Sequence, residues 1–377
     1  MHLRTAFGRV GLRVWRGKDP ADGHWSCPIR ECWGLSAHQQ LSPALEDKLA
    51  YFGTVASSYE AAAKLASKLG YPVEDTTIRA LVQRLGAKAE AQVQARLGRT
   101  PLEKEPRRAP APLAVLMLDG FQVRFRGPGW GRKRTSQPRV EWHELKLGVF
   151  YCHAPAIRQG RGQLVEKVLV SWQGEGLELG RRLHWEAQRG GLGRAREVLA
   201  VGDGAPWIWN VVDDRWAGAH QLLDFYHASQ HVGTLGEALH PRDEVARRDW
   251  VEACRHRLRH GQAEAVLAQI AGLPHRRGTL GKIIRREQNY FASHIGRMNY
   301  QQVARRGWPI GSGAVESGCR TRQCRRKRPG QFWTPTGLRH LDALEEADEV
   351  VQGDVWEEEG HKVGFVWASE LREDHVG

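Results

Sequence analysis

Long apolar runs are absent from this 377-residue sequence, and cysteine and methionine are scarce, with six and three residues. No apolar run reaches the roughly 18 residues that a membrane-spanning helix requires. No internal repeat of roughly 20 to 50 residues is visible, which excludes a solenoid. The opening segment lacks the apolar core of a secretory signal. The sequence therefore predicts a cytoplasmic protein with reduced thiols and no disulfide framework.

Two of the cysteines, Cys27 and Cys32, lie near His24 and His38. This grouping leaves a zinc site open as an alternative. The four residues between the cysteines make a longer spacing than the usual two-residue knuckle, so we expect ordinary thiols.

Positive charge is abundant but unevenly distributed. The formal net charge is +13, yet residues 342–377 contain twelve acidic and only two basic residues. That segment carries −10, and residues 1–341 therefore carry +23. Such a body attracts polyanions, and nucleic acid is the expected partner because neutralising phosphates releases counterions. A basic enzyme without a polyanionic partner is the alternative.

Composition and periodicity divide the chain into five parts. A small N-terminal region has no clear fold, a helical region follows, a Pro-rich basic linker separates it from a strand-and-helix domain, and an acidic tail closes the chain. The corresponding ranges are 1–40, 41–98, 99–112, 113–345 and 346–377. Strands that alternate with helices predict an α/β domain built on a mixed sheet. Helical periodicity from about 228 to 305 predicts a long helical insertion in it.

The helical region contains three short periodic segments, at 42–54, 58–69 and 76–85. Gly70 ends the second as a C-cap, and residues 72–77 supply a turn and a cap before the third. Two short helices joined in this way are typical of a helix-turn-helix that reads a DNA major groove. A plain helical hairpin that packs on its neighbours fits the pattern equally well.

Three carboxylates stand at positions where a charge needs a partner. Asp119 follows the apolar run 113–118, and Asp203 follows the apolar run 197–202. Glu316 begins a predicted helix after a glycine- and serine-rich segment. Each alone fits a strand-ending turn or a first helical turn. Together they are the hard oxygen ligands that Mg²⁺ requires for phosphoryl transfer.

Four segments in order carry a family resemblance: LMLDG at 116–120, VGDGAPWIW at 201–209, DFYH at 224–227 and GSGAVES at 311–317. They resemble the DDE transposases of bacterial insertion sequences, most closely the Kra-type group allied to the Mutator-like superfamily. The resemblance covers residues 36–345. It implies a ribonuclease H-like fold with a helical insertion, and Asp119, Asp203 and Glu316 as catalytic residues that bind Mg²⁺ or Mn²⁺.

The same resemblance implies that Asp224 and His227 support the active site, near the scissile DNA, without being main metal ligands. A helix cap at Asp224 and a partly buried ring at His227 are the alternative. Two basic clusters, one after Glu316 and one in a glycine-rich loop, predict contacts to DNA phosphates. These residues are Arg320, Arg322, Arg325, Arg326, Lys327 and Arg328 after Glu316, and Arg132, Lys133 and Arg134 in a glycine-rich loop. A solvated basic face and a flexible surface loop are the alternatives.

The sequence thus predicts a bacterial, nucleoid-associated transposase that binds terminal inverted repeats, cleaves the DNA ends and joins their 3′ hydroxyls to target DNA. A dimer or larger assembly on double-stranded DNA is expected because two ends must be brought together. A catalytically inactive DNA-binding regulator and a structure-selective DNA nuclease remain alternatives. The acidic tail is open between a solubility tail, a mimic of DNA and a contact to another subunit.

Overall fold

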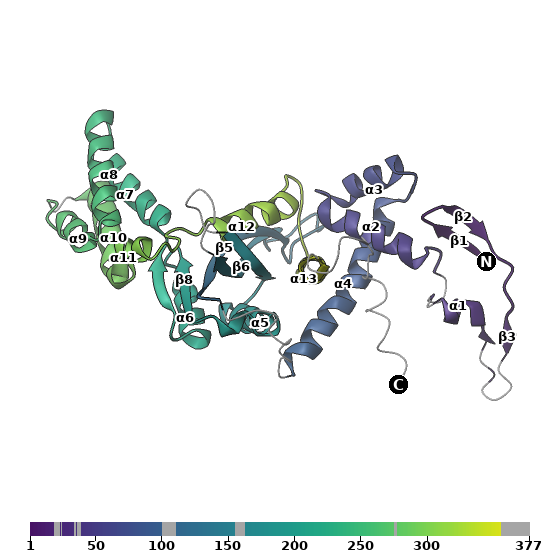
Figure 1. The fold of residues 1–377 in the computed structure, drawn as a ribbon. Coiled ribbons are helices and arrows are strands. Elements are labelled where there is room, and N and C mark those ends of the chain that lie inside the picture. Colours follow the sequence, from purple (N-terminus) through teal and green to yellow (C-terminus); the bar gives the residue numbers. More distant parts are fainter. Residues whose placement is uncertain are drawn as a thin grey trace. The chain divides into compact units, whose positions relative to one another are not determined.

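The computed structural model describes residues 1–18, 23, 25–33, 35, 39–99, 111–154, 163–274 and 277–355 (Figure 1). The chain divides into two compact units, neither of which is continuous in sequence. Unit 1 comprises Met1–Arg99, Val123–His143 and Arg322–Gly377, and unit 2 comprises Thr100–Gln122 and Glu144–Thr321. This division differs from the contiguous ranges that composition suggests. Residues 100–110 of the expected linker (99–112) and residues 356–377 of the expected acidic tail lie outside the described residues.

Helices form the core of unit 1. They are α2 (Pro43–Val55), α3 (Tyr59–Lys68), α4 (Asp75–Leu97) and α13 (Pro335–Val355). Ser42 caps α2 by accepting a hydrogen bond from the Leu45 amide, and Ser58 caps α3 from the Ala61 amide. Both caps satisfy amides that a helix start leaves unpaired. The three expected N-terminal helices are confirmed.

The third of these helices is longer than the sequence predicts. It runs through Gly86 to Leu97, whereas the periodicity predicts an end at residue 85. A Cβ at Gly86 would overlap the main-chain oxygen of His340 on α13. This glycine therefore serves close helix packing and does not end the helix. Helix α13 likewise continues to Val355, ten residues into the range expected for the acidic tail.

The N-terminal region of unit 1 forms two small hairpins and a short helix. The elements are β1 (His2–Thr5), β2 (Gly8–Gly11), β3 (Gly17–Lys18), β4 (Trp25–Ser26) and α1 (Pro28–Cys32). Cys27 is buried and Cys32 is exposed, and both thiols are free. The histidines of the alternative zinc site, His24 and His38, lie outside the described residues.

Unit 2 is built on a five-stranded mixed sheet in the order β7-β6-β5-β8-β9. The strands are β5 (Leu113–Arg126), β6 (Val140–Ala154), β7 (Gln163–Trp172), β8 (Glu197–Gly202) and β9 (His220–Leu223). Strands β6 and β7 are antiparallel, whereas β5, β8 and β9 are parallel to one another. The expected mixed α/β architecture is confirmed. The ends of β5 and β6, Val123–Arg126 and Val140–His143, belong to unit 1.

Helices cover both faces of this sheet. A Cβ at Gly148 of β6 would meet Leu183 of α5 (Gly176–Arg189) at 2.6 Å. The neighbouring Leu147 side chain lies against Gly318 of α12 (Gly313–Arg326). Adjacent strand residues point to opposite faces, so α5 and α12 cover opposite sides. Helix α6 (Pro206–Arg215) packs beside α5 through Val211.

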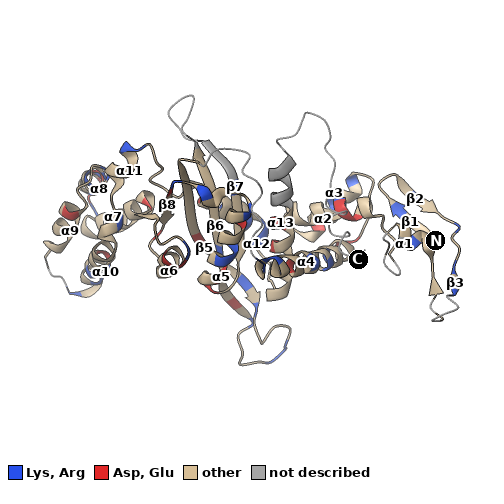
Figure 2. Cartoon of the chain, turned by 60° about the horizontal axis from the view of Figure 1, so that its bottom comes forward, with Lys and Arg blue, Asp and Glu red and all other residues tan. Residues whose placement is uncertain are grey.

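The expected helical insertion is confirmed and begins directly after β9. Its elements are α7 (Phe225–Leu239), α8 (Glu244–Arg259), α9 (Ala263–Ala271), α10 (Gly278–His294), the 3₁₀ turn η2 (Ile295–Arg297) and α11 (Tyr300–Arg305). Figure 2 shows basic and acidic residues interspersed on α8, as expected of a solvated helix. Among the helices in the described ranges, none combines the length and apolar character that crossing a bilayer requires.

Candidate active site

The two aspartates are brought together by strand register. Leu118 of β5 pairs with Gly202 of β8 in parallel alignment, so Asp119 and Asp203 occupy the next position on neighbouring strands. Strand β8 ends there, whereas β5 continues to Arg126. The expectation that the first strand ends at Asp119 is therefore wrong. Asp119 lies in mid-strand, at the point where β8 stops covering that side of β5.

The third carboxylate comes from α12. The Asp119 side chain accepts a hydrogen bond from Cys319, about one turn along α12 from Glu316. Burial raises the pKa of Asp119 above its usual value, and the negative charges of Asp203 and Glu316 raise it further. Hydrogen bonds from Gly120 and Cys319 act in the opposite direction. The structure therefore places Asp203 and Glu316 near enough to Asp119 for their charges to affect its pKa.

Each carboxylate has only neutral hydrogen-bond donors in the described part of the chain. Asp119 Oδ1 accepts from the Gly120 amide at 2.6 Å, and Asp203 Oδ1 accepts from the Ala205 amide at 2.9 Å. Ser312 Oγ donates to Glu316 Oε1 at 3.0 Å. Across the residues described, no group of three or more His, Cys, Asp or Glu side chains is arranged closely enough to hold a metal ion. The cluster is thus an uncompensated set of carboxylates, not a closed cage.

Asp224 links the insertion to the helix that carries Glu316. This residue is only 1% exposed. Its Oδ1 accepts from the His227 amide at 2.8 Å and caps α7, and its Oδ2 accepts from the Ser312 amide at 2.5 Å. The Phe225 amide also donates to the Ile310 oxygen at 3.0 Å. Asp224 therefore holds the start of α7 against the segment that leads into α12.

The main chain at Asp203 is held by the insertion. The Tyr290 hydroxyl of α10 donates to the Asp203 carbonyl oxygen at 3.0 Å. The His231 ring stacks on the Tyr290 ring with centroids 3.6 Å apart, and its Nδ1 lies 2.5 Å from Oε2 of the fully buried Glu287. Burial and the nearby negative charge of Asp203 raise the pKa of Tyr290, so its hydroxyl stays protonated as a donor. We refer to Glu287, His231 and Tyr290 as the insertion relay.

Packing beside the relay also explains the glycine after Asp203. Gly204 has φ +101°, and a Cβ there would meet His294 Nε2 at 2.9 Å. His227 lies in the same group of rings, with its centroid 5.0 Å from that of His231. Of the residues in this group, only His227 was predicted from the sequence. The sequence pattern that could have identified this group is the four-residue spacing of His227 and His231 on one helix, and of Tyr290 and His294 on another.

Another carboxylate near Asp119 was also missed. A Cβ at Gly120 would meet Oε1 of Glu144, on β6, at 2.6 Å. Glu144 Oε2 pairs with Lys146 Nζ at 2.8 Å, and Lys146 also donates to the Gly174 oxygen. Glu144 is thus a neutralised carboxylate beside the cluster, which distinguishes it from the three unpaired ones.

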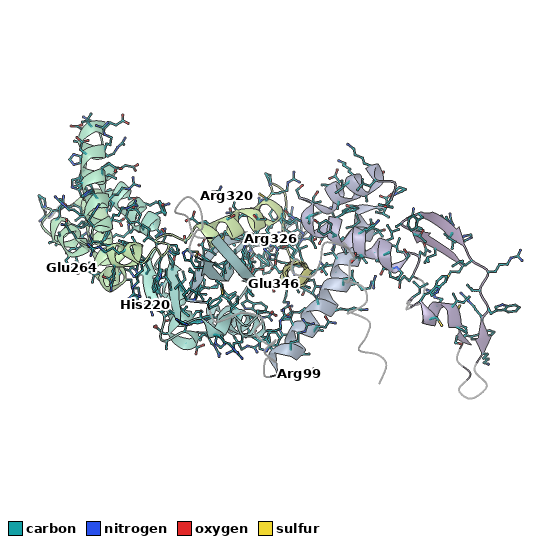
Figure 3. All side chains as sticks on the ribbon, in the orientation of Figure 1. Arg99, His220, Glu264, Arg320, Arg326 and Glu346 are labelled. Carbon is teal, nitrogen blue, oxygen red and sulfur yellow. The ribbon has the colours of Figure 1, made fainter. Side chains whose placement is uncertain are left out.

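The basic run on α12 is largely buried, contrary to expectation. Arg322, Arg325 and Arg326 are 3%, 5% and 1% exposed. Figure 3 labels Arg326, the last residue of α12. Arg326 Nε donates to Asp342 Oδ1 at 2.9 Å, and both Arg326 and Arg322 pair with Glu345. The prediction that these three residues contact DNA phosphates is therefore wrong for this structure. The anions that pair with Arg322 and Arg326 are carboxylates of α13.

Arg325 is buried without a carboxylate bond of its own. Its guanidinium lies 4.6 Å from the centroid of the Tyr59 ring and 5.3 Å from that of Trp333, and it faces the carbonyl oxygens of Gly53 and Ser57. Burial lowers its pKa. Cation–π contacts and carbonyl oxygens hold this residue within unit 1.

The remaining members of the basic clusters are exposed. They are Arg320, Lys327 and Arg328 after Glu316, and Arg132, Lys133 and Arg134 in the loop between β5 and β6. Arg328 Nη1 donates to Ser57 Oγ, and the carbonyl oxygens of Arg132 and Lys133 accept from Arg139. The structure leaves the side chains of these six residues at the surface.

Comparisons with known proteins give distant similarities. No family model matches the chain. A curated protein of Streptococcus gallolyticus, described as "UPF0236 protein in vanSb 3′region", is 24% identical over 346 residues, covering 90% of this chain and 70% of that protein. Among solved structures, the Drosophila P element transposase strand transfer complex aligns with 11% identity over 82% of this chain and 79% of that chain. Its TM-score is 0.28, which is too low to establish a shared fold.

Proposed function

We propose that this protein is a DDE-type DNA transposase that binds the terminal inverted repeats of its element, cleaves the DNA ends and joins their 3′ hydroxyls to target DNA. The observation that carries the proposal is the parallel pairing that sets Asp119 level with Asp203 in unit 2, together with Glu316, whose negative charge raises the pKa of Asp119. Phosphoryl transfer needs hard oxygen ligands gathered at one point, and these three come from two neighbouring strands and one helix.

The sheet supports a ribonuclease H-like assignment for unit 2. Three sequential strands, β5 to β7, lie on one side, and β8 and β9 extend the sheet in parallel beyond β5. Asp203 stands at the carboxyl end of β8, and Asp119 stands level with it on β5. Ligands of open α/β sheets bind at such carboxyl ends.

The chemistry of the donors fits Mg²⁺ or Mn²⁺, and in the described part of the chain the three side chains are not yet arranged closely enough to hold an ion. Asp119, Asp203 and Glu316 supply only oxygen, and none is ion-paired among the described residues. Like charges close together disfavour ionisation, and a divalent cation relieves that repulsion. Mg²⁺ binds through few carboxylates and keeps several water or phosphate ligands, so an open set of three suffices. When bound, the metal activates the attacking oxygen and stabilises the leaving oxygen.

Protein groups around the cluster act by positioning. Asp224 and Ser312 fix the start of α12, and this sets the position of Glu316. Tyr290 fixes the main chain at Asp203. Catalytic groups must be held within a fraction of an ångström of their working geometry, which requires such supporting contacts.

DNA binding is proposed for two surfaces. The turn between α3 and α4 leaves Thr76, Thr77 and Arg79 exposed at the start of α4, where a recognition helix contacts base edges. The six exposed basic residues listed above are proposed to contact phosphates. Joining two element ends implies a dimer or larger assembly on DNA.

Cleavage of labelled DNA carrying the element ends tests the proposal. Wild type, Asp203→Asn and the control Asp214→Asn, an exposed carboxylate of the same unit, are compared with Mg²⁺ and with Mn²⁺. We expect end-specific nicking and strand joining by wild type and the control. Asp203→Asn should lose at least about a hundredfold in rate, the scale of removing a main electrostatic group. Its DNA affinity should not fall, because the cluster repels phosphates without metal.

Two outcomes would replace this function with another. Tight end-specific binding without cleavage by wild type in either metal would identify a DNA-binding regulator, which the open carboxylate set in the described residues also fits. Cleavage of branched DNA irrespective of sequence would identify a structure-selective nuclease. Equal loss of binding and cleavage in Asp203→Asn would contradict the assigned catalytic role.

A further inference from the structure

A cavity of about 510 Å³ lies in unit 2, where the start of β9 meets the last elements of the insertion. Its lining includes Arg297 of η2, Arg306 and Trp308, together with His220 and Gln221 of β9. Guanidinium, imidazole, amide and indole groups around one hollow are typical of a site that binds a polar, anionic ligand. None of these residues takes part in the carboxylate cluster.

Charge in this cavity is unbalanced. Arg306 Nη1 pairs with Glu197 Oε1 at 2.8 Å, and His220 Nε2 lies 3.3 Å from the same oxygen. Arg297 Nε donates to Gln221 Oε1 at 2.7 Å, and in the described part of the chain it has no carboxylate partner. Gln221 Nε2 in turn donates to Asp213 Oδ1 at 2.6 Å, so Arg306 has a carboxylate partner of its own, whereas Gln221 separates Arg297 from the carboxylate beside it. A partly buried cation without a counter-charge is stabilised by an anion.

Neighbouring rings hold the two guanidinium groups in place. The Arg297 guanidinium carbon lies 4.5 Å from the centroid of the Trp209 ring, and that of Arg306 lies 4.7 Å from the centroid of the Trp308 ring. The His220 ring meets Trp308 edge to face at 5.2 Å. A guanidinium fixed in this way loses little side-chain freedom when it binds a phosphate.

The cavity is close to the carboxylate cluster. His220 starts β9 and Asp224 follows its end, which places them about 13 Å apart along the strand at 3.3 Å per residue. The segment from Trp308 to Ser312 connects the cavity with the Asp224 clamp, through the bonds of Ile310 and Ser312. That separation equals about four base pairs of duplex DNA. Because β8 and β9 are parallel, the cavity lies at the amino-terminal end of β9 and the carboxylates lie level with its carboxyl end, so one duplex must span the length of this strand to contact both.

We propose that this cavity binds a backbone phosphate of the DNA whose ends the carboxylate cluster cleaves, with Arg297 as the principal ligand and Arg306 beside it. The proposal rests on the proposed function, since it names the same DNA as ligand. Free phosphate has the same chemistry, and the experiment below separates the two sources.

Salt-dependent DNA binding tests this proposal in the Asp203→Asn background, so that cleavage does not disturb the measurement. Arg297→Gln is compared with Arg305→Gln, which removes the same charge from an exposed residue of α11 outside the cavity. Loss of one phosphate contact should weaken binding about tenfold and reduce the salt slope by about one. Arg305→Gln should keep the parent affinity and slope. Arg297→Lys should restore most of the slope, because it keeps the charge.

Equal effects of Arg297→Gln and Arg305→Gln would overturn the proposal. So would stabilisation of the protein by millimolar inorganic phosphate that Arg297→Gln abolishes while DNA binding stays unchanged, since this would assign the cavity to a free phosphate. Thermal unfolding of Arg297→Gln, together with the Arg297→Lys rescue, separates lost contact from lost fold.

The outcomes for the two proposals differ. Cleavage by wild type with no selective effect of Arg297→Gln contradicts the cavity assignment alone. A selective effect of Arg297→Gln on binding, with no cleavage by wild type, contradicts the transposase assignment and supports the cavity. Absence of any DNA binding by wild type contradicts both.

Discussion

The buried ion network of α12 and α13 gives the sharpest prediction of stability. Asp342→Ala removes a carboxylate that accepts from Arg326, whose side chain is 1% exposed. Arg326 would then keep only Glu345, which it shares with Arg322. Breaking a buried pair from one side costs about 3–5 kcal/mol, because the remaining charge stays buried without its partner. We expect a loss of that size in urea unfolding followed by circular dichroism.

Matched variants separate this role from DNA binding. The double variant Arg326→Met with Asp342→Leu removes both charges and should recover most of the lost stability, because apolar replacement of a buried pair is often neutral or stabilising. Glu60→Ala breaks an exposed helical pair of the same unit and should leave the unfolding midpoint nearly unchanged. A structural role for Arg326 and Asp342 is ruled out if Asp342→Ala unfolds like wild type while the double variant, still folded, loses DNA affinity.

Three further changes have defined outcomes. Gly86→Ala should destabilise the protein by about 1–3 kcal/mol through overlap with α13, whereas Gly233→Ala in α7, where a Cβ meets nothing within 4 Å, should stabilise it by up to about 1 kcal/mol in the same thermal-unfolding assay. Tyr290→Phe leaves the Asp203 carbonyl without its donor, so cleavage should fall at unchanged DNA affinity, and equal cleavage would exclude a positioning role. Hydrogen bonds from arginines one turn along α5 lower the pKa of Glu178 from the usual 4.5. Its stabilising contribution is present above that value and lost as pH falls through the lowered pKa, so the stability difference from Glu178→Gln should shrink below about pH 4.5 and would be misassigned if it grew.

Local pattern was sufficient to predict most elements of the chain. Serine caps and helical periodicity predicted α2 and α3, and apolar runs predicted β5 and β8. The predicted end of α4 was wrong because a glycine at position 86, directly after the periodic segment, resembles a helix C-cap in the sequence. Its real neighbour is the backbone of His340, some 250 residues away in the chain, and no local pattern carries that contact.

The candidate site was likewise predicted only in part from the sequence. The apolar run before each aspartate predicted that a charge needed a partner, and strand pairing brought the two together. The basic run after Glu316 was assigned to DNA because no acid is interleaved in it. The acids that pair with Arg322 and Arg326 stand on α13, at Asp342 and Glu345, in the segment 342–377 that carries a net charge of −10. Net charge counts ions and does not reveal which of them neutralise each other inside the fold.

The insertion relay limits which parts of the helical insertion can change in length. Tyr290 reaches Asp203 from the last long helix of the insertion, and His231 and Glu287 join that helix to the first one. The intervening α8 and α9 make none of these three contacts. The segment between α7 and α10 can therefore be shortened or lengthened without loss of these contacts. Deletion of the whole insertion would remove the Tyr290 hydrogen bond that holds the loop after β8.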